Sequence, residues 1–143
     1  MQTKKTIASP EAPPALGPYS QAVKVNDTVY VSGQLPIDAK TGQLVEGDIE
    51  AQTERVLLNI RAILEEGEAS LRDVVKVSIF LTNLGDFAAV NRVYELFFPT
   101  HDNSSALLPA RSTVEVSRLP RGASIEMDAI AVIGDGYIDL ELY

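Results

Sequence analysis

The chain has 143 residues, of which 45% are hydrophobic and 22% are charged, as in globular proteins with a buried core. Its 20 acidic residues outnumber the 12 basic ones, and the net charge of −8 disfavours binding to nucleic acid because phosphate groups are repelled. No apolar run reaches the roughly 18 residues that a transmembrane helix needs, so we expect no membrane association. The lack of cysteine excludes disulfides and thiolate chemistry, and it fits a cytoplasmic protein.

Metal and cofactor chemistry is also disfavoured. The chain has one histidine, His101, which cannot by itself build a histidine metal cluster or a Ser-His-Asp arrangement. We therefore expect no bound metal and no cofactor. Residues 1–7 include two lysines but are followed by no apolar segment, so we expect no signal peptide.

The first twenty residues predict one short strand and a stiff loop. Residues 6–8 are expected to open a strand before the proline-rich loop at 9–14. Gly17 and Pro18 continue this irregular path and present the Tyr19 phenol rigidly. That phenol either leans over a pocket or packs at the edge of the core.

A β-hairpin is predicted next. Residues 22–25 and 28–32 are rich in β-formers, and the Asn-Asp pair at 26–27 is a two-residue turn signal. The second strand is expected to end in Ser32, Gly33 and Gln34. Gly33 allows either the close approach of a ligand or another chain, or a simple β-bulge.

Two helices are predicted from the spacing of apolar residues. Asp48 is the expected N-cap of the first, and Gly67 ends it. The second helix, at 87–98, is expected to have Asp86 as its N-cap and to end at Pro99. The apolar residues at helical spacing are Val56, Leu57, Ile60, Ile63 and Leu64 in the first helix, and Val90, Val93, Leu96 and Phe97 in the second.

The remaining strands are predicted at 74–81, 111–116 and 124–132, with a polar loop at 100–108. The order β, β, helix, β, helix, β, β predicts an α+β fold in which one sheet carries both helices on one face. Val, Ile and Ala dominate both faces of the late strands, so the uncovered face of the sheet indicates an oligomer.

Arg111 is the first candidate site residue. It begins a strand that reads as buried, and the two-residue period places Arg111, Thr113 and Glu115 on one face. Because a guanidinium stays charged, a site that excludes water must supply an anion, such as the carboxylate of a small substrate. The alternative is an arginine at the end of a strand whose head group reaches solvent or a neighbouring acidic residue.

Glu126 is the second candidate. Glu126 and Asp128 share one face of the last strand, which indicates either a solvated polar face or a site lined with acid. The residues alone do not decide between these two interpretations.

Several short segments form a recognisable series along the chain: 17–22 (GPYSQA), 32–36 (SGQLP), 86–91 (DFAAVN) with Tyr94 and Phe97-Phe98, 111–116 (RSTVEV) with 118–120 (RLP), and 125–131 (IEMDAIA). Taken together, they resemble the RidA/YjgF family over roughly residues 4–133. We expect a single domain of this kind at 1–143, with 134–143 as an extra C-terminal tail.

The resemblance implies a chorismate-mutase-like fold that assembles as a homotrimer around a β-barrel, with clefts between subunits. It also implies hydrolysis of reactive enamines and imines (2-aminoacrylate, 2-iminopropanoate, 2-iminobutanoate) to 2-keto acids and ammonia. Two alternatives remain: a regulatory trimer that binds small carboxylates without turnover, and an endoribonuclease or translation inhibitor, which the charge of −8 disfavours.

The resemblance also implies roles for particular residues. Arg111 would hold the substrate carboxylate, Glu126 would position water and move a proton, and Tyr19 would close the cleft from a neighbouring subunit. The implied substrate-binding residues are Ser32, Gly33, Asn91, Arg111 and Thr113. Members of the family often carry cysteine in place of Thr113, and since an imine needs no thiolate, we expect activity to survive with an altered substrate preference.

Overall fold

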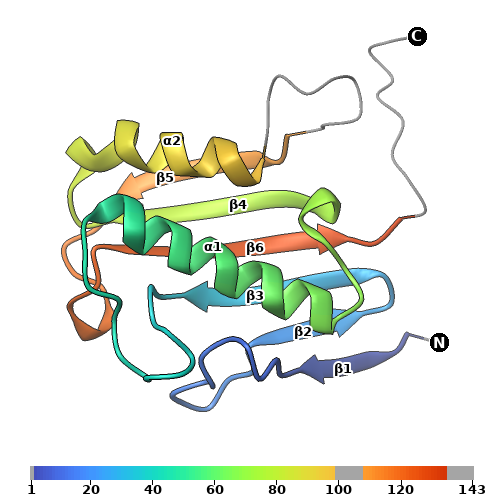
Figure 1. Cartoon of the computed structure of the whole chain (residues 1–143). Coiled ribbons are helices and arrows are strands. Elements are labelled where there is room, and N and C mark those ends of the chain that lie inside the picture. Colours follow the sequence, from blue (N-terminus) through green and yellow to red (C-terminus); the bar gives the residue numbers. More distant parts are fainter. Residues whose placement is uncertain (1, 99–107, 135–143) are drawn as a thin grey trace, which may run out of the picture.

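The computed structural model describes residues 2–98 and 108–134, so the predicted tail after residue 134, Pro99 and most of the loop at 100–108 lie outside it. Six strands form one mixed sheet, and two helices cover the same face of that sheet (Figure 1). The predicted α+β class is confirmed. In chain order the elements are β1 (Lys4–Ile7), β2 (Ala22–Val25), β3 (Thr28–Gln34), α1 (Ile49–Glu66), β4 (Val74–Leu81), α2 (Phe87–Phe97), β5 (Ala110–Glu115) and β6 (Ile125–Val132).

The sheet has the order β1-β2-β3-β6-β4-β5. Every neighbouring pair is antiparallel except β4 and β5, which are parallel because α2 connects them. The last strand in sequence, β6, therefore lies in the middle of the sheet, and β5 forms one edge.

Local signals place the ends of α1 and the hairpin. The Asp48 carboxylate accepts a hydrogen bond from the backbone N–H of Ala51 at 3.0 Å, and Gly67 follows the last turn of α1, as predicted. Asn26 has a φ of 51°, the left-handed conformation that asparagine tolerates in tight turns, and Val25 pairs with Thr28 across it.

The start of α2 differs from the prediction. Asp86 precedes α2, but its side chain makes no capping hydrogen bond. A 3₁₀ turn at Leu84–Asp86 comes first, and Asn83 accepts a hydrogen bond from the Gly85 N–H at 2.9 Å in that turn. Asp86 already has helical dihedral angles, so it lacks the extended backbone with which a residue reaches forward to cap a helix.

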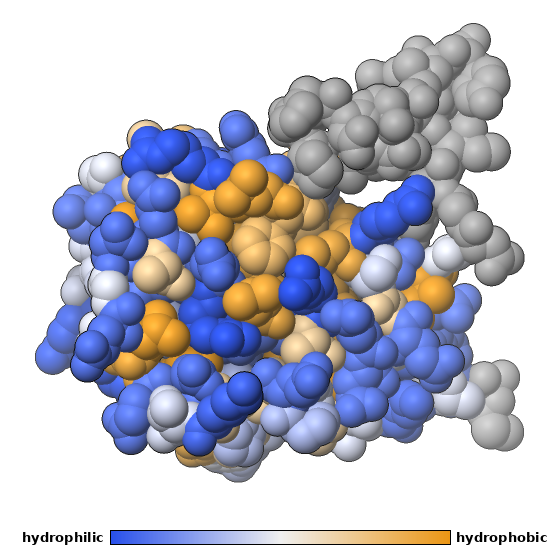
Figure 2. Space-filling view, viewed as in Figure 1, coloured by the Kyte–Doolittle hydropathy of each residue, from blue (hydrophilic) through white to orange (hydrophobic). Residues whose placement is uncertain are grey.

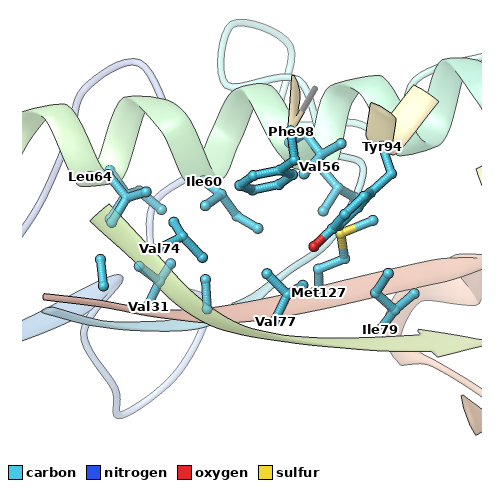
Figure 3. Packing of buried hydrophobic residues seen from close by; sticks show 14 of the residues in the cluster. Val31, Val56, Ile60, Leu64, Val74, Val77, Ile79, Tyr94, Phe98 and Met127 are labelled. Atoms are coloured by element: carbon cyan, nitrogen blue, oxygen red, sulfur yellow. The ribbon is translucent and has the colours of Figure 1, made fainter. Parts of the chain in front are cut away.

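The core lies between the helices and the sheet (Figure 3). The predicted apolar face of α1 is buried there. Of the apolar residues at helical spacing in α2, Val90 and Val93 are buried, whereas Leu96 is 78% exposed. Helix α2 lies towards the β5 edge of the sheet (Figure 1). Seen from the helix side, the surface is mostly hydrophilic, with hydrophobic residues gathered in its middle (Figure 2).

The other face of the sheet is less apolar than predicted. Strand β6 alternates between buried residues and half-buried ones, and the half-buried set begins with Glu126 and Asp128. The register pairs Phe80 with Glu126 and Ser78 with Asp128. The residues on this face in β3 to β6 include Tyr30, Lys76, Ser78, Phe80, Ser112, Val114, Glu126, Asp128, Ile130 and Val132. We name them the open face; it mixes apolar and polar side chains.

Strand β5 is not the buried strand that its sequence indicates. Among the described strands it pairs with β4 alone, and each of its residues is either exposed or half-buried. Arg111 and Thr113 are the half-buried ones. No helix in the described part of the chain combines the length and the apolar character needed to cross a membrane.

Candidate functional site

Arg111 lies on the helix side of the sheet. It is in register with the core residue Val77, and residues in register share a face. Its guanidinium carbon lies 4.7 Å from the ring centroid of Tyr94 and 5.5 Å from that of Phe87. The Arg111 guanidinium therefore lies against two aromatic rings of α2. It is placed there because β5 pairs with β4 and α2 packs against this edge of the sheet.

One side of α2 faces this arginine. Phe87, Asn91 and Tyr94 follow the spacing i, i+4, i+7, which places them along one stripe of a helix. Asn91 and Arg111 line the same open cavity of about 270 Å³, so the structure brings these two predicted residues together. The cavity is lined by Asn91, Tyr94, Glu95, Phe98, Leu108, Pro109 and Arg111.

The charge of Arg111 is not neutralised by an ion pair within the described residues. The three ion pairs found there join Lys24 to Glu68, Arg61 to Glu65 and Arg92 to Glu50. Burial raises the pKa of Tyr94 to about 12, an effect that the nearby Arg111 charge opposes only in part. The phenol is therefore neutral at working pH and places no negative charge beside the guanidinium.

Two hydroxyl groups on the helix side of this edge are buried without a hydrogen-bond partner among the described residues. They belong to Tyr94 on α2 and Thr113 on β5. Such groups normally find partners, because an unpaired buried hydroxyl costs free energy. Thr113 and Arg111 are both half-buried on this side, as the two-residue period predicts.

Glu126 occupies a second region, at the junction of β3 and β6. The pairing of these strands is irregular between Val31 and Gln34, so Ser32 and Gly33 form the β-bulge that was one of the two predicted alternatives. A Cβ atom added to Gly33 would lie 2.9 Å from Cδ of Glu126 and closer still to its carboxylate oxygen. Glycine is therefore required for Glu126 to take this position.

The electrostatic setting of Glu126 favours its protonated form. Burial, and to a smaller degree the neighbouring Asp128 carboxylate, raises the pKa of Glu126 above its usual value. A glutamic acid with a raised pKa exchanges protons nearer to neutral pH, which suits acid–base chemistry.

Ser32 and Tyr19 adjoin the Glu126 region. The Ser32 hydroxyl donates a hydrogen bond to the Ser20 carbonyl at 2.6 Å, so its proton is already engaged. Tyr19 is half exposed; its hydroxyl accepts a hydrogen bond from the Leu16 N–H at 3.2 Å, and its ring lines a small pocket together with Gly33.

Gln21 supports this region and was not predicted. Its buried side-chain amide accepts a hydrogen bond from the Ser9 N–H at 2.7 Å and donates to the Pro13 carbonyl at 2.9 Å. The backbone carbonyl of Gln21 accepts a hydrogen bond from the Ser32 N–H at 2.9 Å. Gln21 thus joins the proline-rich loop to the β3 bulge, which no local pattern in the sequence could have indicated.

The chain does not bring all the predicted residues into one site. Arg111, Asn91 and Thr113 lie on the helix side of the β5 edge, and we name them the cation half-site. Glu126 lies on the open face, because it alternates with core residues of β6 and pairs with Phe80. Its neighbours are grouped with it as the acid half-site: Tyr19, Ser32, Gly33 and Glu126.

The chain is a small α+β protein with an arginine at an open cavity and, on the opposite face of its sheet, a glutamate whose pKa is raised. Residues 9–133 match the family described as Endoribonuclease L-PSP. The 2-iminobutanoate/2-iminopropanoate deaminase of Salmonella typhimurium is 48% identical over 128 residues, which cover 90% of this chain and 97% of that protein. The chain belongs to the Endoribonuclease L-PSP family, and its resemblance to RidA/YjgF proteins is confirmed.

Solved structures agree with this assignment. A Thermotoga maritima protein described as a candidate endoribonuclease has a TM-score of 0.86 at 52% identity, over 92% of this chain and 99% of that one. Escherichia coli TdcF, whose crystal structure holds bound serine, has a TM-score of 0.84 at 40% identity, over 91% of this chain and 99% of TdcF.

Proposed function

We propose that this protein hydrolyses the enamines and imines of 2-keto acids, among them 2-aminoacrylate, 2-iminopropanoate and 2-iminobutanoate, to 2-keto acids and ammonia. The observation that carries the proposal is the Arg111 guanidinium, which borders a cavity and has no ion-pair partner among the described residues. Relatives named as deaminases and the serine bound to TdcF support a small carboxylate ligand.

The reaction needs little from the protein beyond binding and proton transfer. Arg111 would hold the substrate carboxylate through two parallel hydrogen bonds. Water would attack the electrophilic carbon of the protonated imine, and the Glu126 carboxylate would accept a proton from that water. Glu126 would then pass this proton to the nitrogen, and the C–N bond would break as a carbonyl forms. The hydroxyl proton of the intermediate would leave with the ammonia as ammonium, so that the 2-keto acid is released and the Glu126 carboxylate is regenerated.

We propose that the site is completed between subunits of a homotrimer. Arg111 and Glu126 lie on opposite faces of one sheet, so a small substrate cannot contact both within one chain. In a ring of three copies, the cation half-site of each subunit would meet the acid half-site of the next. The open face and the edge strand β5 offer unpaired surface for this assembly.

A test of the activity generates 2-aminoacrylate in place with a serine dehydratase and follows the release of pyruvate. The protein should accelerate pyruvate release above the spontaneous rate, without added metal. In light scattering coupled to size exclusion, the mass should be three times that of the 15.5 kDa chain. Tight binding of 2-keto acids with only the spontaneous rate of release would instead favour the regulatory alternative.

We further propose a cytoplasmic location, which the lack of cysteine supports.

A further inference from the structure

Two aromatic rings from one helix lie against the guanidinium of Arg111. Phe87 and Tyr94 are two turns apart on α2, and their ring centroids lie 5.5 Å and 4.7 Å from the guanidinium carbon. A cation near aromatic rings is attracted by their electron-rich faces, and a planar guanidinium also stacks on them. Because an aromatic ring attracts the cation without accepting a conventional hydrogen bond from it, the five N–H donors of the guanidinium stay available for a carboxylate.

The hydroxyl of Tyr94 does not hold Arg111. Figure 3 shows the Tyr94 side chain reaching from α2 into the core, with its oxygen at the inner end. That oxygen is buried and lacks a hydrogen-bond partner among the described residues. The phenol is neutral at working pH, as its pKa of about 12 requires. The ring is therefore the part of Tyr94 that acts on the arginine.

From this geometry we infer that Tyr94 and Phe87 are positioning residues that hold the Arg111 guanidinium with its edge towards the substrate carboxylate. This inference rests on the proposed function, in which Arg111 binds that carboxylate. Neutral rings suit the task better than an Asp or Glu, because a carboxylate partner would occupy the same donors and compete with the substrate. A fixed head group also loses less side-chain entropy when the substrate binds.

The chain offers a matched control on the same helix. Phe97 lies 5.9 Å from the guanidinium carbon of Arg61, a contact of the same kind. Arg61 also pairs with Glu65 at 3.9 Å on the exposed surface of α1, and neither arginine nor phenylalanine belongs to a half-site. Phe97→Leu therefore removes an aromatic ring from α2 without removing one from Arg111.

The experiment compares F87L, Y94L, Y94F, R111A and F97L as full-length proteins. It measures the Kd for 2-oxobutanoate by calorimetry, and kcat and KM for imine hydrolysis. F87L and Y94L should raise Kd and KM by about 2- to 30-fold, with Y94L having the larger effect because its ring is closer and buried. The kcat should change much less than KM. Y94F, which keeps the ring, should retain most of the affinity, and F97L should match the wild type.

Phe87 is 40% exposed, so F87L should fold even if the buried Y94L substitution does not. If F87L and Y94L bind 2-oxobutanoate like the wild type while R111A does not, the positioning role is wrong and the proposed function stands. If Y94F weakens binding as much as Y94L, the hydroxyl acts rather than the ring, and the inference is overturned. If R111A itself binds normally, the proposed function fails and there is no arginine clamp to position.

Discussion

Gly33 leaves the space that the carboxyl group of Glu126 occupies. The two residues meet where β3 bulges away from regular pairing with β6, and a Cβ on Gly33 would lie 2.9 Å from Cδ of Glu126. An atom pair at that distance must separate, and the long glutamate side chain is the part that can move most easily. The bulge and its glycine therefore determine where the acid half-site places its carboxyl group.

Gly33→Ala should give a folded protein with a displaced Glu126. We expect kcat/KM for imine hydrolysis to fall by about 10-fold or more, because general acid–base catalysis depends on the position of the proton-transferring group. In an E126A background, the same Gly33→Ala change should have almost no effect on the residual activity. Equal losses in both backgrounds would show that Gly33 acts through something other than Glu126.

Glu126→Gln should change how stability depends on pH. Because the folded state raises the pKa of Glu126, the folded protein binds more protons than the unfolded chain between the two pKa values. The wild type should therefore lose stability as the pH rises through that window and recover it as the pH falls. E126Q, which carries no charge at this position, should be more stable than the wild type at neutral pH, and the difference should vanish in acid. Urea unfolding of both proteins at fixed protein concentration, from pH 4 to pH 8, measures this difference in the free energy of unfolding. An E126Q variant that is less stable than the wild type at neutral pH would contradict the predicted sign.

Thr113→Val should stabilise the protein. It replaces a buried hydroxyl that has no partner among the described residues with a methyl group of similar size, and valine suits a strand at least as well as threonine. The free energy of unfolding should rise by about 1 kcal/mol. A loss of that size would reveal a partner for the hydroxyl, such as a bound water or a group from a neighbouring subunit.

Arg111→Ala should lower kcat/KM by about 10²- to 10³-fold, because it removes both charge-assisted hydrogen bonds to the carboxylate. Arg111→Lys should restore only part of this, since an ammonium group cannot present two parallel donors. Steady-state kinetics and size exclusion check both points, with the exposed Arg118→Ala as the control that should match the wild type. An Arg111→Ala protein that dissociates or unfolds would show that Arg111 is structural instead.

The elements that could be predicted from the sequence are those with local signals. Asp48 and Gly67 bound α1, and the turn at Asn26 joins β2 to β3, because caps and tight turns depend on a few consecutive residues. The edge position of β5 could not be predicted, since it depends on which strand pairs with β4 across a connection through α2. The alternating sequence around Arg111 does form a strand, but that strand lies at the edge of the sheet and is not buried.

For the candidate site, too, local features could be predicted and non-local ones could not. Arg111 and Glu126 could be selected from the sequence as candidates. For each of them, the family resemblance favoured a role in the site over a solvated or structural role. Their placement on opposite faces needs the register of β4 with both of its neighbours, which is non-local. The contact of Tyr94 with Arg111 likewise depends on how α2 packs on β5, although the spacing of Phe87, Asn91 and Tyr94 already marks one stripe of the helix.

The central claim is that Arg111 and Glu126 of different subunits form one active site, and mixed trimers test it most directly. R111A and E126Q chains, each inactive as a homotrimer, are combined with different affinity tags, and the trimers that contain both are isolated. In either mixed composition, one of the three interfaces would pair an intact Arg111 with an intact Glu126, so activity should return to about a third of the wild type. Mixed trimers that remain as inactive as their parents would contradict the claim, because a site built within one chain cannot be restored by a neighbour.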